Sequence, residues 1–273
     1  MLESMAETAL VTGASGGIGE EFAKLLASRG CNLVLVARSG DKLARLAEAL
    51  TAAHKIQVDC LPMDLSRASS APQIQSMLES KKIEIDILIN NAGFGTFGPF
   101  VDSDLESELA QIQLNVTTLT HLTKLMLPGM IRRGRGKILN VASTAAFQPG
   151  PLMAVYYATK AYVLSFSEAL ANELKGSGVT VTCLCPGPTR TGFMARAKMG
   201  DPEILAKKSV MMEAALVARK GVDGLMKGKR LVIPGVLNKL LAHSTRLGPR
   251  GLNASVVRRI MEEIRATGGT SST

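Results

Sequence analysis

The stretch TGASGGIG, residues 12–19, lies between an apolar run and a helical pattern, and it decides the fold. Residues 8–12 (TALVT) predict a buried strand, and the pattern from about Ile18 to Ser28 predicts a helix, which Gly30 ends. Glycines allow the tight turn between such a strand and helix. Because the free N–H groups and positive dipole at a helix start attract phosphate oxygens, this context predicts a site for a nucleotide diphosphate.

The alternation of strand and helix continues along the chain. Apolar runs predict further strands over residues 31–37, 56–63, 85–90, 137–142 and 179–185, with a weaker one over 230–233. Helical periodicity predicts helices over 41–53, 71–81, about 105–132 and 155–174. Nearly continuous apolar strands separated by helices are typical of a parallel sheet covered on both faces. We therefore predict an α/β fold with a single doubly wound (Rossmann) parallel sheet of about seven strands and helices on both faces.

One domain is predicted over residues 1–266, because no linker or internal repeat interrupts the pattern. Residues 190–228 break the rhythm and would lie over the carboxyl ends of the strands, where ligands bind. They are interpreted as a substrate lid, with an ordinary pair of surface helices as the alternative. Residues 229–266 are predicted to form a basic amphipathic extension, and residues 267–273, which contain only Thr, Gly and Ser, are expected to be disordered.

The glycine spacing is T-G-x-x-x-G-x-G rather than G-x-G-x-x-G, and it resembles that of the short-chain dehydrogenase/reductase family. The resemblance also rests on Asn90-Asn91-Ala92-Gly93 after the fourth strand, on Tyr156-x-x-x-Lys160 with Ser143 thirteen positions upstream, and on Pro186-Gly187 after the sixth strand. It covers residues 8–192 and fades beyond them. The resemblance implies an oxidoreductase that uses a nicotinamide cofactor.

The resemblance also implies which residues hold this cofactor. They are Gly13, Ser15, Gly17, Ile18, Gly19, Arg38, Ser39, Asp64, Leu65, Asn91, Gly93, Tyr156, Lys160, Pro186, Gly187, Thr189 and Thr191. Asp64 and Leu65 match family positions that contact the adenine, although Asp64 also suits a helix start. The family usually has an aliphatic residue where Thr189 stands, so the chain departs from the pattern there.

The residues after the second strand indicate NADP(H) rather than NAD(H). Folds of this kind that bind NAD place Asp or Glu there, to accept a hydrogen bond from the ribose 2′-OH. Here the strand ends in Arg38-Ser39, without a carboxylate. A guanidinium suits the 2′-phosphate of NADP(H) through paired N–H donors, and NADP-preferring family members carry Arg at this place. An exposed loop arginine is the alternative interpretation.

Tyr156 and Lys160 are four residues apart in a predicted helix, so they share one face. A positive charge beside a phenol favours the phenolate, which lets a tyrosine serve as acid and base. Tyr157 lies three residues before Lys160, but the four-residue spacing and the serine at position 143 favour Tyr156. The resemblance implies that Ser143 donates a hydrogen bond to the substrate oxygen and that Asn115 helps to relay protons to the lysine.

These residues predict the interconversion of a ketone or aldehyde and an alcohol by hydride transfer. The stretch 191–212 contains four methionines, which suit either an adaptable apolar pocket or core packing. An apolar substrate is expected, and an acyl thioester is among the candidates. One alternative is a non-catalytic NADP(H)-binding regulator, which the complete catalytic set disfavours. The other is a sugar-nucleotide epimerase or dehydratase, which the glycine spacing disfavours.

The excess of positive charge lies near the C-terminus. Residues 196–273 carry 15 Lys and Arg against 6 Asp and Glu, whereas residues 1–195 carry 17 of each. This excess suits a phosphate-bearing substrate, an acidic carrier protein or an anionic membrane surface, or it serves solubility alone. One apolar helix face comprises Val256, Val257, Ile260, Met261 and Ile264. It would pack on its own domain, on a membrane or on a second subunit. The last is favoured, since the family forms dimers and tetramers.

The remaining features predict a soluble cytoplasmic protein and a homodimer or homotetramer. The four cysteines lie mostly in apolar runs, as is typical of reduced buried thiols. The acidic N-terminus lacks a signal-peptide pattern, and no apolar run is long enough to span a membrane. The three histidines have no metal-ligand spacing, and neither a metal nor a nucleic acid is predicted as a partner.

Overall fold

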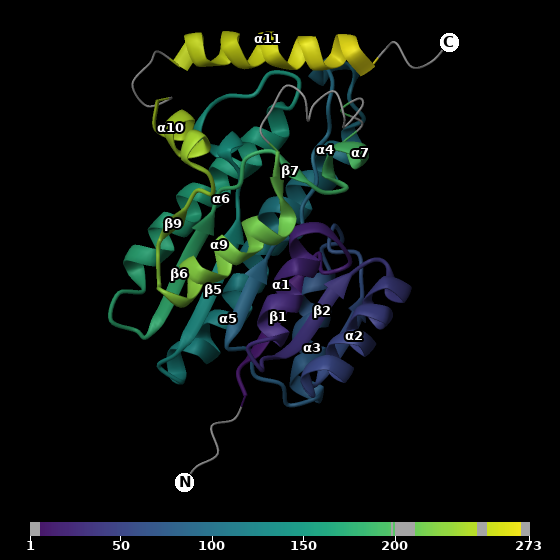
Figure 1. Cartoon of the computed structure of the whole chain (residues 1–273), viewed down its shortest axis with the longest axis vertical. Helices are drawn as coiled ribbons and strands as arrows, with labels where there is room; N and C mark the ends of the chain where they lie inside the picture. The colour runs from purple at the N-terminus through teal and green to yellow at the C-terminus, as the bar shows by residue number, and fades with distance from the viewer. Residues whose placement is uncertain (1–5, 198, 200–210, 245–249, 269–273) are drawn as a thin grey trace.

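The structure is a computed structural model that describes residues 6–197, 199, 211–244 and 250–268. In these residues seven parallel strands form one sheet, in the order β3-β2-β1-β4-β5-β6-β9 (Figure 1). The strands are β1 (Thr8–Thr12), β2 (Asn32–Ala37), β3 (Val58–Pro62), β4 (Ile87–Asn90), β5 (Gly136–Val141), β6 (Val179–Leu184) and β9 (Leu231–Val232). The direction of the strand order reverses between β1 and β4, so the chain leaves these two strands in opposite directions at the carboxyl edge. The predicted doubly wound fold is confirmed.

Helices cover both faces of the sheet. One face carries α1 (Gly17–Ala27), α2 (Gly40–His54) and α9 (Ala214–Met226), and the other carries α3 (Ser70–Ser80), α5 (Leu119–Arg132) and α6 (Ala154–Glu173). Because side chains alternate along a strand, Ala9 and Val11 face the first layer whereas Leu10 faces the second. The two cores are therefore built by the same strands.

The lid predicted over residues 190–228 is wrong for its last part. Val217, Val222 and Leu225 of α9 are fully buried, and α9 lies along α1 on the face of the sheet (Figure 1). This helix is core because its apolar stripe completes the cover over β5 and β6. The short strands β7 (Thr189–Arg190) and β8 (Met212–Glu213) pair in parallel, and α7 (Phe193–Arg196) follows β7. Residues 198 and 200–210 of the predicted lid lie outside the described residues.

The long helix predicted over residues 105–132 contains a π-helical turn. After the short 3₁₀ turn η1 (Phe100–Asp102), α4 (Leu105–Ile112) is followed by the π turn η2 (Gln113–Thr118) and then by α5. Asn115 lies in the π turn and is buried. A π turn holds an extra residue within a helix, and such turns are frequent at functional sites.

The C-terminal extension returns over the carboxyl edge of the sheet. It consists of α10 (Val236–Ser244) and α11 (Arg250–Gly268), and α11 lies across the top of the view in Figure 1. Val257, Met261 and Ile264 of α11 are buried in an apolar cluster with residues near the ends of β5 and β6. The subunit interface favoured for these three residues is therefore wrong, because their own domain covers them.

The end of α11 also differs from the expectation. The helix continues to Gly268, so Thr267 and Gly268 are helical rather than disordered, and residues 269–273 lie outside the described residues. Helical hydrogen bonds along α11 extend the order beyond its last apolar contacts. Among the described helices, none combines the length and the apolar character needed to cross a membrane.

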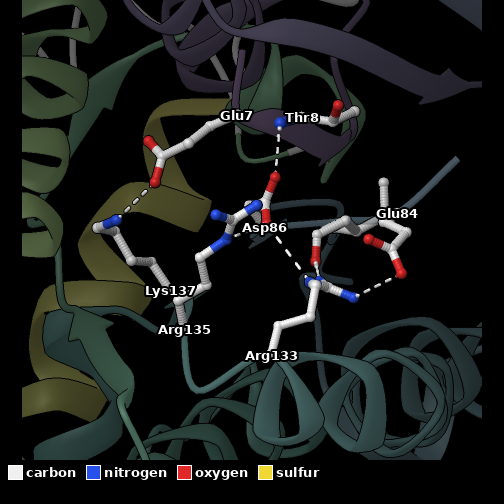
Figure 2. Close-up of polar contacts among 8 residues, drawn as sticks. Glu7, Thr8, Glu84, Asp86, Arg133, Arg135 and Lys137 are labelled. Carbon is white, nitrogen blue, oxygen red and sulfur yellow. Dashed lines mark hydrogen bonds and ion pairs between the residues drawn. The ribbon is translucent and has the colours of Figure 1, made fainter. Parts of the chain in front are cut away.

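A charged network closes the amino edge of the sheet, opposite the edge that α11 covers (Figure 2). Asp86, just before β4, accepts a hydrogen bond from the Thr8 N–H at 3.1 Å. Its second oxygen lies 3.3 Å from Arg135 Nε and 3.7 Å from Arg133 Nε. Because Asp86 is only 5% exposed, these contacts join the starts of β1, β4 and β5 through a buried carboxylate.

Candidate active site

A cavity of about 630 Å³ opens at the carboxyl edge of the sheet. Most of the predicted site residues line it, namely Gly13, Ser15, Gly17, Ile18, Arg38, Ser39, Asp64, Leu65, Asn91, Gly93, Ser143, Tyr156, Lys160, Pro186, Gly187, Thr189 and Thr191. Gly19 and Asn115 are buried outside its lining. Distant sequence segments meet here because the carboxyl ends of parallel strands share one edge. Within the described ranges, no three His, Cys, Asp or Glu side chains gather as a metal ion would require.

The glycine turn after β1 requires glycine at three positions. Gly13 has a φ of +69°, and a Cβ there would lie 2.8 Å from Asn91 Nδ2. Gly17 has a φ of +57° and would place a Cβ 3.0 Å from Thr191 Cγ2. A Cβ at Gly19 would lie 2.2 Å from the Gly13 carbonyl oxygen, so Gly19 serves the packing of α1 on the turn. The start of α1 has no side-chain cap, which leaves N–H groups for an anion.

The end of β2 presents cations to the cavity. Arg38 and Ser39 line it in exposed positions, and so does Lys42, in the first turn of α2. Burial raises the pKa of Asp64, but hydrogen bonds from Ser66 and the charges of Arg38 and a second arginine outweigh it and hold that pKa below its ordinary value. Sequence reasoning missed Lys42, although its position four residues after Arg38 was a usable signal.

Ser143 and Tyr156 meet in the middle of the cavity. Ser143 lies between β5 and the 3₁₀ turn η3 (Thr144–Phe147), where its Oγ accepts a hydrogen bond from the Ala145 N–H at 3.1 Å. The same hydroxyl lies 3.4 Å from the Pro186 carbonyl oxygen. Tyr156, in the first turn of α6, lies beside Ser143 in the cavity lining, and interaction with the Ser143 hydroxyl acts to lower the pKa of its phenol. Two hydroxyl groups therefore face the space where a carbonyl oxygen could be held.

Tyr157 has different surroundings, although its ring also borders the cavity. It packs so closely under Gly150 that a Cβ on that glycine would lie 2.1 Å from the ring. Its ring centroid is 6.1 Å from that of Tyr156, and burial raises the pKa of Tyr157 to about 12. The interaction of Tyr156 with Ser143, which Tyr157 does not share, favours Tyr156 as the acid.

Lys160 lies one helical turn beyond Tyr156. Its Nζ is 5.8 Å from the Tyr156 ring centroid and donates to a β5 carbonyl oxygen at 2.8 Å. Asn115 donates through Nδ2 to the Phe94 carbonyl at 2.9 Å and accepts from the Phe94 N–H at 3.2 Å. A Cβ on Gly93 would lie 3.1 Å from Asn115 Oδ1 and 3.4 Å from Lys160 Nζ, so these groups converge there. The relay role of Asn115 stays a prediction.

Burial shifts the pKa values of the two α6 residues in opposite directions. It raises the pKa of Tyr156, although the interaction with Ser143 opposes it, and it lowers the pKa of Lys160 to about 8. The sequence led us to expect a lowered tyrosine pKa, but removal of the phenol from water outweighs the opposing interaction with Ser143. Tyr156 is therefore protonated at neutral pH and can donate a proton.

The segment after β6 returns along the cavity toward the glycine turn. Thr189 Oγ1 donates to the Gly187 carbonyl oxygen at 2.9 Å. Thr191 Oγ1 accepts from the Phe193 N–H at 3.3 Å, at the start of α7, and the same residue faces Gly17. The segment therefore links the glycine turn to α7.

The end of the cavity beyond Tyr156 is apolar. It is lined by Met153, Phe193, Met194, Met199 and Met261. Phe193 lies against Tyr156, with 5.1 Å between ring centroids. The sequence left open whether the methionines after β6 form a pocket or a core, and two of them lie in the cavity wall. Met261 was missed as a site residue because it comes from α11, and only the path of the chain brings it there.

Comparisons with known proteins agree with this geometry. A family model described as short chain dehydrogenase matches residues 7–201. A very-long-chain 3-oxoacyl-CoA reductase of Pyrenophora tritici-repentis is 34% identical over 262 residues, which cover 93% of this chain and 76% of the relative. The protein of the same name from Bos taurus is 36% identical over 67% of this chain, and the match spans 59% of its length. A solved short-chain dehydrogenase from Sphingobium yanoikuyae in complex with NADPH has a TM-score of 0.77 at 35% identity, with 88% of this chain and 94% of that chain covered.

Proposed function

The chain belongs to the short-chain dehydrogenase family, and we propose that it is an NADP(H)-dependent reductase of an apolar, acyl-type carbonyl substrate. The observation that carries the proposal is the continuity of the cavity. Glycines and cations line one end, Ser143 and Tyr156 lie in the middle, and methionines line the other end. The first part suits the phosphates of a cofactor, the middle suits a reacting carbonyl, and the last part suits an acyl chain.

The first part of the cavity fits a nicotinamide dinucleotide with a 2′-phosphate. Gly13 and Gly17 leave open the space that side chains would fill, and the N–H groups at the start of α1 would hold the diphosphate. Arg38 offers paired N–H donors to the 2′-phosphate, and Lys160 would hold the nicotinamide ribose. When bound, the nicotinamide supplies the hydride for the carbonyl carbon.

In this proposal Tyr156 transfers the proton to the substrate oxygen. Its raised pKa keeps the phenol protonated at neutral pH, so it can donate a proton to the carbonyl oxygen as the alcohol forms. Ser143 would donate a hydrogen bond to the same oxygen and stabilise its developing negative charge. The Lys160 cation, 5.8 Å from the tyrosine ring centroid, would stabilise the phenolate left behind.

The apolar end of the cavity supports an acyl substrate. Flexible thioethers adapt to chains of different shape, and four methionines with Phe193 line this end. The relatives named as very-long-chain 3-oxoacyl-CoA reductases support the same class. The reacting carbonyl would then lie near Tyr156, with the chain extending toward α11.

A substrate panel tests the proposal. The purified protein is mixed with NADPH and with 3-oxoacyl-CoA thioesters of increasing chain length, or with small ketones, and the loss of NADPH absorbance is followed. We expect kcat/KM to rise with chain length. No turnover of any thioester, with turnover of small polar ketones, would reject the acyl-type substrate.

The choice of acid is tested by a matched pair of variants. Tyr156→Phe should lower kcat by about 10²-fold or more, because it removes the proton donor. Tyr157→Phe removes a hydroxyl from the neighbouring ring and should retain most of the activity, since Ser143 interacts with the Tyr156 phenol. Undiminished reduction by Tyr156→Phe would show that another group supplies the proton.

We propose in addition that the chain forms a homodimer or homotetramer in the cytoplasm. Leu105, Leu109 and Ile112 expose an apolar stripe along α4, which supports an assembly face. All four cysteines are free, which supports a reducing compartment. Light scattering of the purified protein tests the assembly, and a monomer mass would reject it. Cell fractionation tests the location.

A further inference from the structure

Arg196, the last residue of α7, reaches the same cavity as Arg38 from a distant part of the chain. Both residues line the cavity, and so does Lys42. The Arg196 guanidinium lies 4.8 Å from the centroid of the Phe94 ring, in the loop after β4. A planar guanidinium stacks well on an aromatic face, so Phe94 holds this cation at the cavity wall.

The charges around Arg196 indicate that its guanidinium lacks a full counterion. Partial burial and the like charge of Arg38 lower the pKa of Arg196, while Asp64 opposes this change. Asp64 accepts hydrogen bonds from Ser66 and also interacts with Arg38. In the part of the chain that the structure describes, Arg196 forms no ion pair. Like charges directed at one cavity repel one another, and an anion placed among them would turn this repulsion into attraction.

We propose that Arg196, together with Arg38 and Lys42, binds the 2′-phosphate of NADP(H). The inference rests on the proposed cofactor and goes beyond it by adding two cations to the one that the family resemblance implies. The 2′-phosphate is favoured over the diphosphate because Arg38, Lys42 and Asp64, which line the cavity together with Arg196, follow β2 and β3, whereas the diphosphate would lie at the glycine turn after β1. Arg196 can offer paired N–H donors to a phosphate, whereas Lys42 offers a point charge.

The same contact would couple the cofactor to the substrate end. Helix α7 also carries Phe193, whose ring centroid lies 5.1 Å from that of Tyr156, and Met194, which lines the apolar wall. An anion bound by Arg196 would therefore hold the element that shapes the substrate pocket. NADPH, but not NADH, should lower the Kd of an unreactive acyl thioester analogue.

Equilibrium titrations of the cofactor-free protein with NADPH and with NADH test the assignment. The chain contains no Trp, so the nicotinamide fluorescence of the bound cofactor gives a clear signal. Arg196→Gln should raise the Kd of NADPH about tenfold or more, because a charge-assisted contact is lost, and should leave the Kd of NADH within about twofold. Arg196→Lys, which keeps the charge without the paired donors, should fall between wild type and Arg196→Gln.

Arg190→Gln is the matched control. It removes the same charge from the same segment, but Arg190 pairs with Glu213 at 2.9 Å and lies outside the cavity lining. Its Kd values for both nucleotides should equal those of wild type. Circular dichroism of each variant checks that the fold is retained.

The outcomes separate this inference from the proposed function. If wild type prefers NADPH and Arg196→Gln binds it equally well, Arg196 plays no part and the proposed function stands. If the variant loses NADPH and NADH equally, the contact is not with the 2′-phosphate and the inference is overturned. If wild type binds NADH more tightly than NADPH, the proposed cofactor itself is wrong.

Discussion

Lys160 is a cation in a buried position, with only 5% of its surface exposed and a backbone carbonyl as its acceptor. Burial lowers its pKa from 10.5 to about 8. Between these two pH values the unfolded chain holds a proton that the folded chain has released, so the free energy of unfolding rises with pH across this window. Burial of the charged lysine destabilises the folded chain, and this destabilisation disappears as the lysine loses its proton.

At the residue scale we therefore predict that Lys160→Met abolishes this pH dependence. The wild-type free energy of unfolding, minus that of the variant, should rise by about 3 kcal/mol between pH 8 and pH 10.5. Urea denaturation at a series of pH values measures it. Lys220→Met, which replaces an exposed lysine of α9, is the control and should give a constant difference. A difference between wild type and Lys160→Met that stays flat or falls over this pH range would contradict the buried charge.

At the scale of the element, α11 has two apolar faces with different surroundings. Met261 faces inward and lines the cavity, whereas its neighbour Ile260 is 51% exposed. Met261→Ser should raise the KM for a long-chain thioester about tenfold, because apolar contact with the chain is lost, and should leave the Kd of NADPH unchanged. Ile260→Ser makes a similar change on the outward face and should alter neither constant. Equal effects of the two variants on KM would mean that the substitutions act by destabilising α11 and not by removing contact with the substrate.

At the scale of the whole molecule, the two edges of the sheet carry separate tasks. The carboxyl edge forms the cavity, and the amino edge is held by Asp86 and its arginines (Figure 2). Asp86→Ala should lower the free energy of unfolding by about 3 kcal/mol, because it leaves a partly buried arginine and the partly buried Thr8 N–H without their acceptor. The KM values should not change. Asp59→Ala breaks a more exposed ion pair with Lys81 and should cost about 1 kcal/mol or less.

Comparing Asp86→Ala with Asp59→Ala tests whether the amino edge serves stability and the carboxyl edge serves the cavity. Denaturation curves and steady-state kinetics are measured on the same preparations. A fall in kcat/KM for Asp86→Ala at a temperature where the protein remains folded would show that the amino edge influences the cavity. Equal losses of stability for both variants would show that burial adds nothing to the Asp86 contacts.

Local patterns in the sequence were enough to predict several of the strands and helices. The strand over residues 8–12 and the glycine turn were predicted at their observed positions, and α6 begins within one residue of its expected start. A short apolar run predicts a strand. Two catalytic residues that are four positions apart lie on one face as soon as their segment is helical. The pairing of Ser143 with Tyr156 was implied by the family resemblance, and both residues line the cavity at the carboxyl edge of the sheet.

What each amphipathic helix covers, by contrast, could be read only from the folded chain. The apolar stripes of α9 and α11 look alike in the sequence, yet one completes the core and the other forms the wall of the cavity. The π turn at Asn115 and the position of Arg196 and Arg38 in one cavity depend on packing between segments far apart in the chain. Periodicity shows that a helix face must be buried, but the partner is chosen by the path of the whole chain, and local sequence does not contain that path.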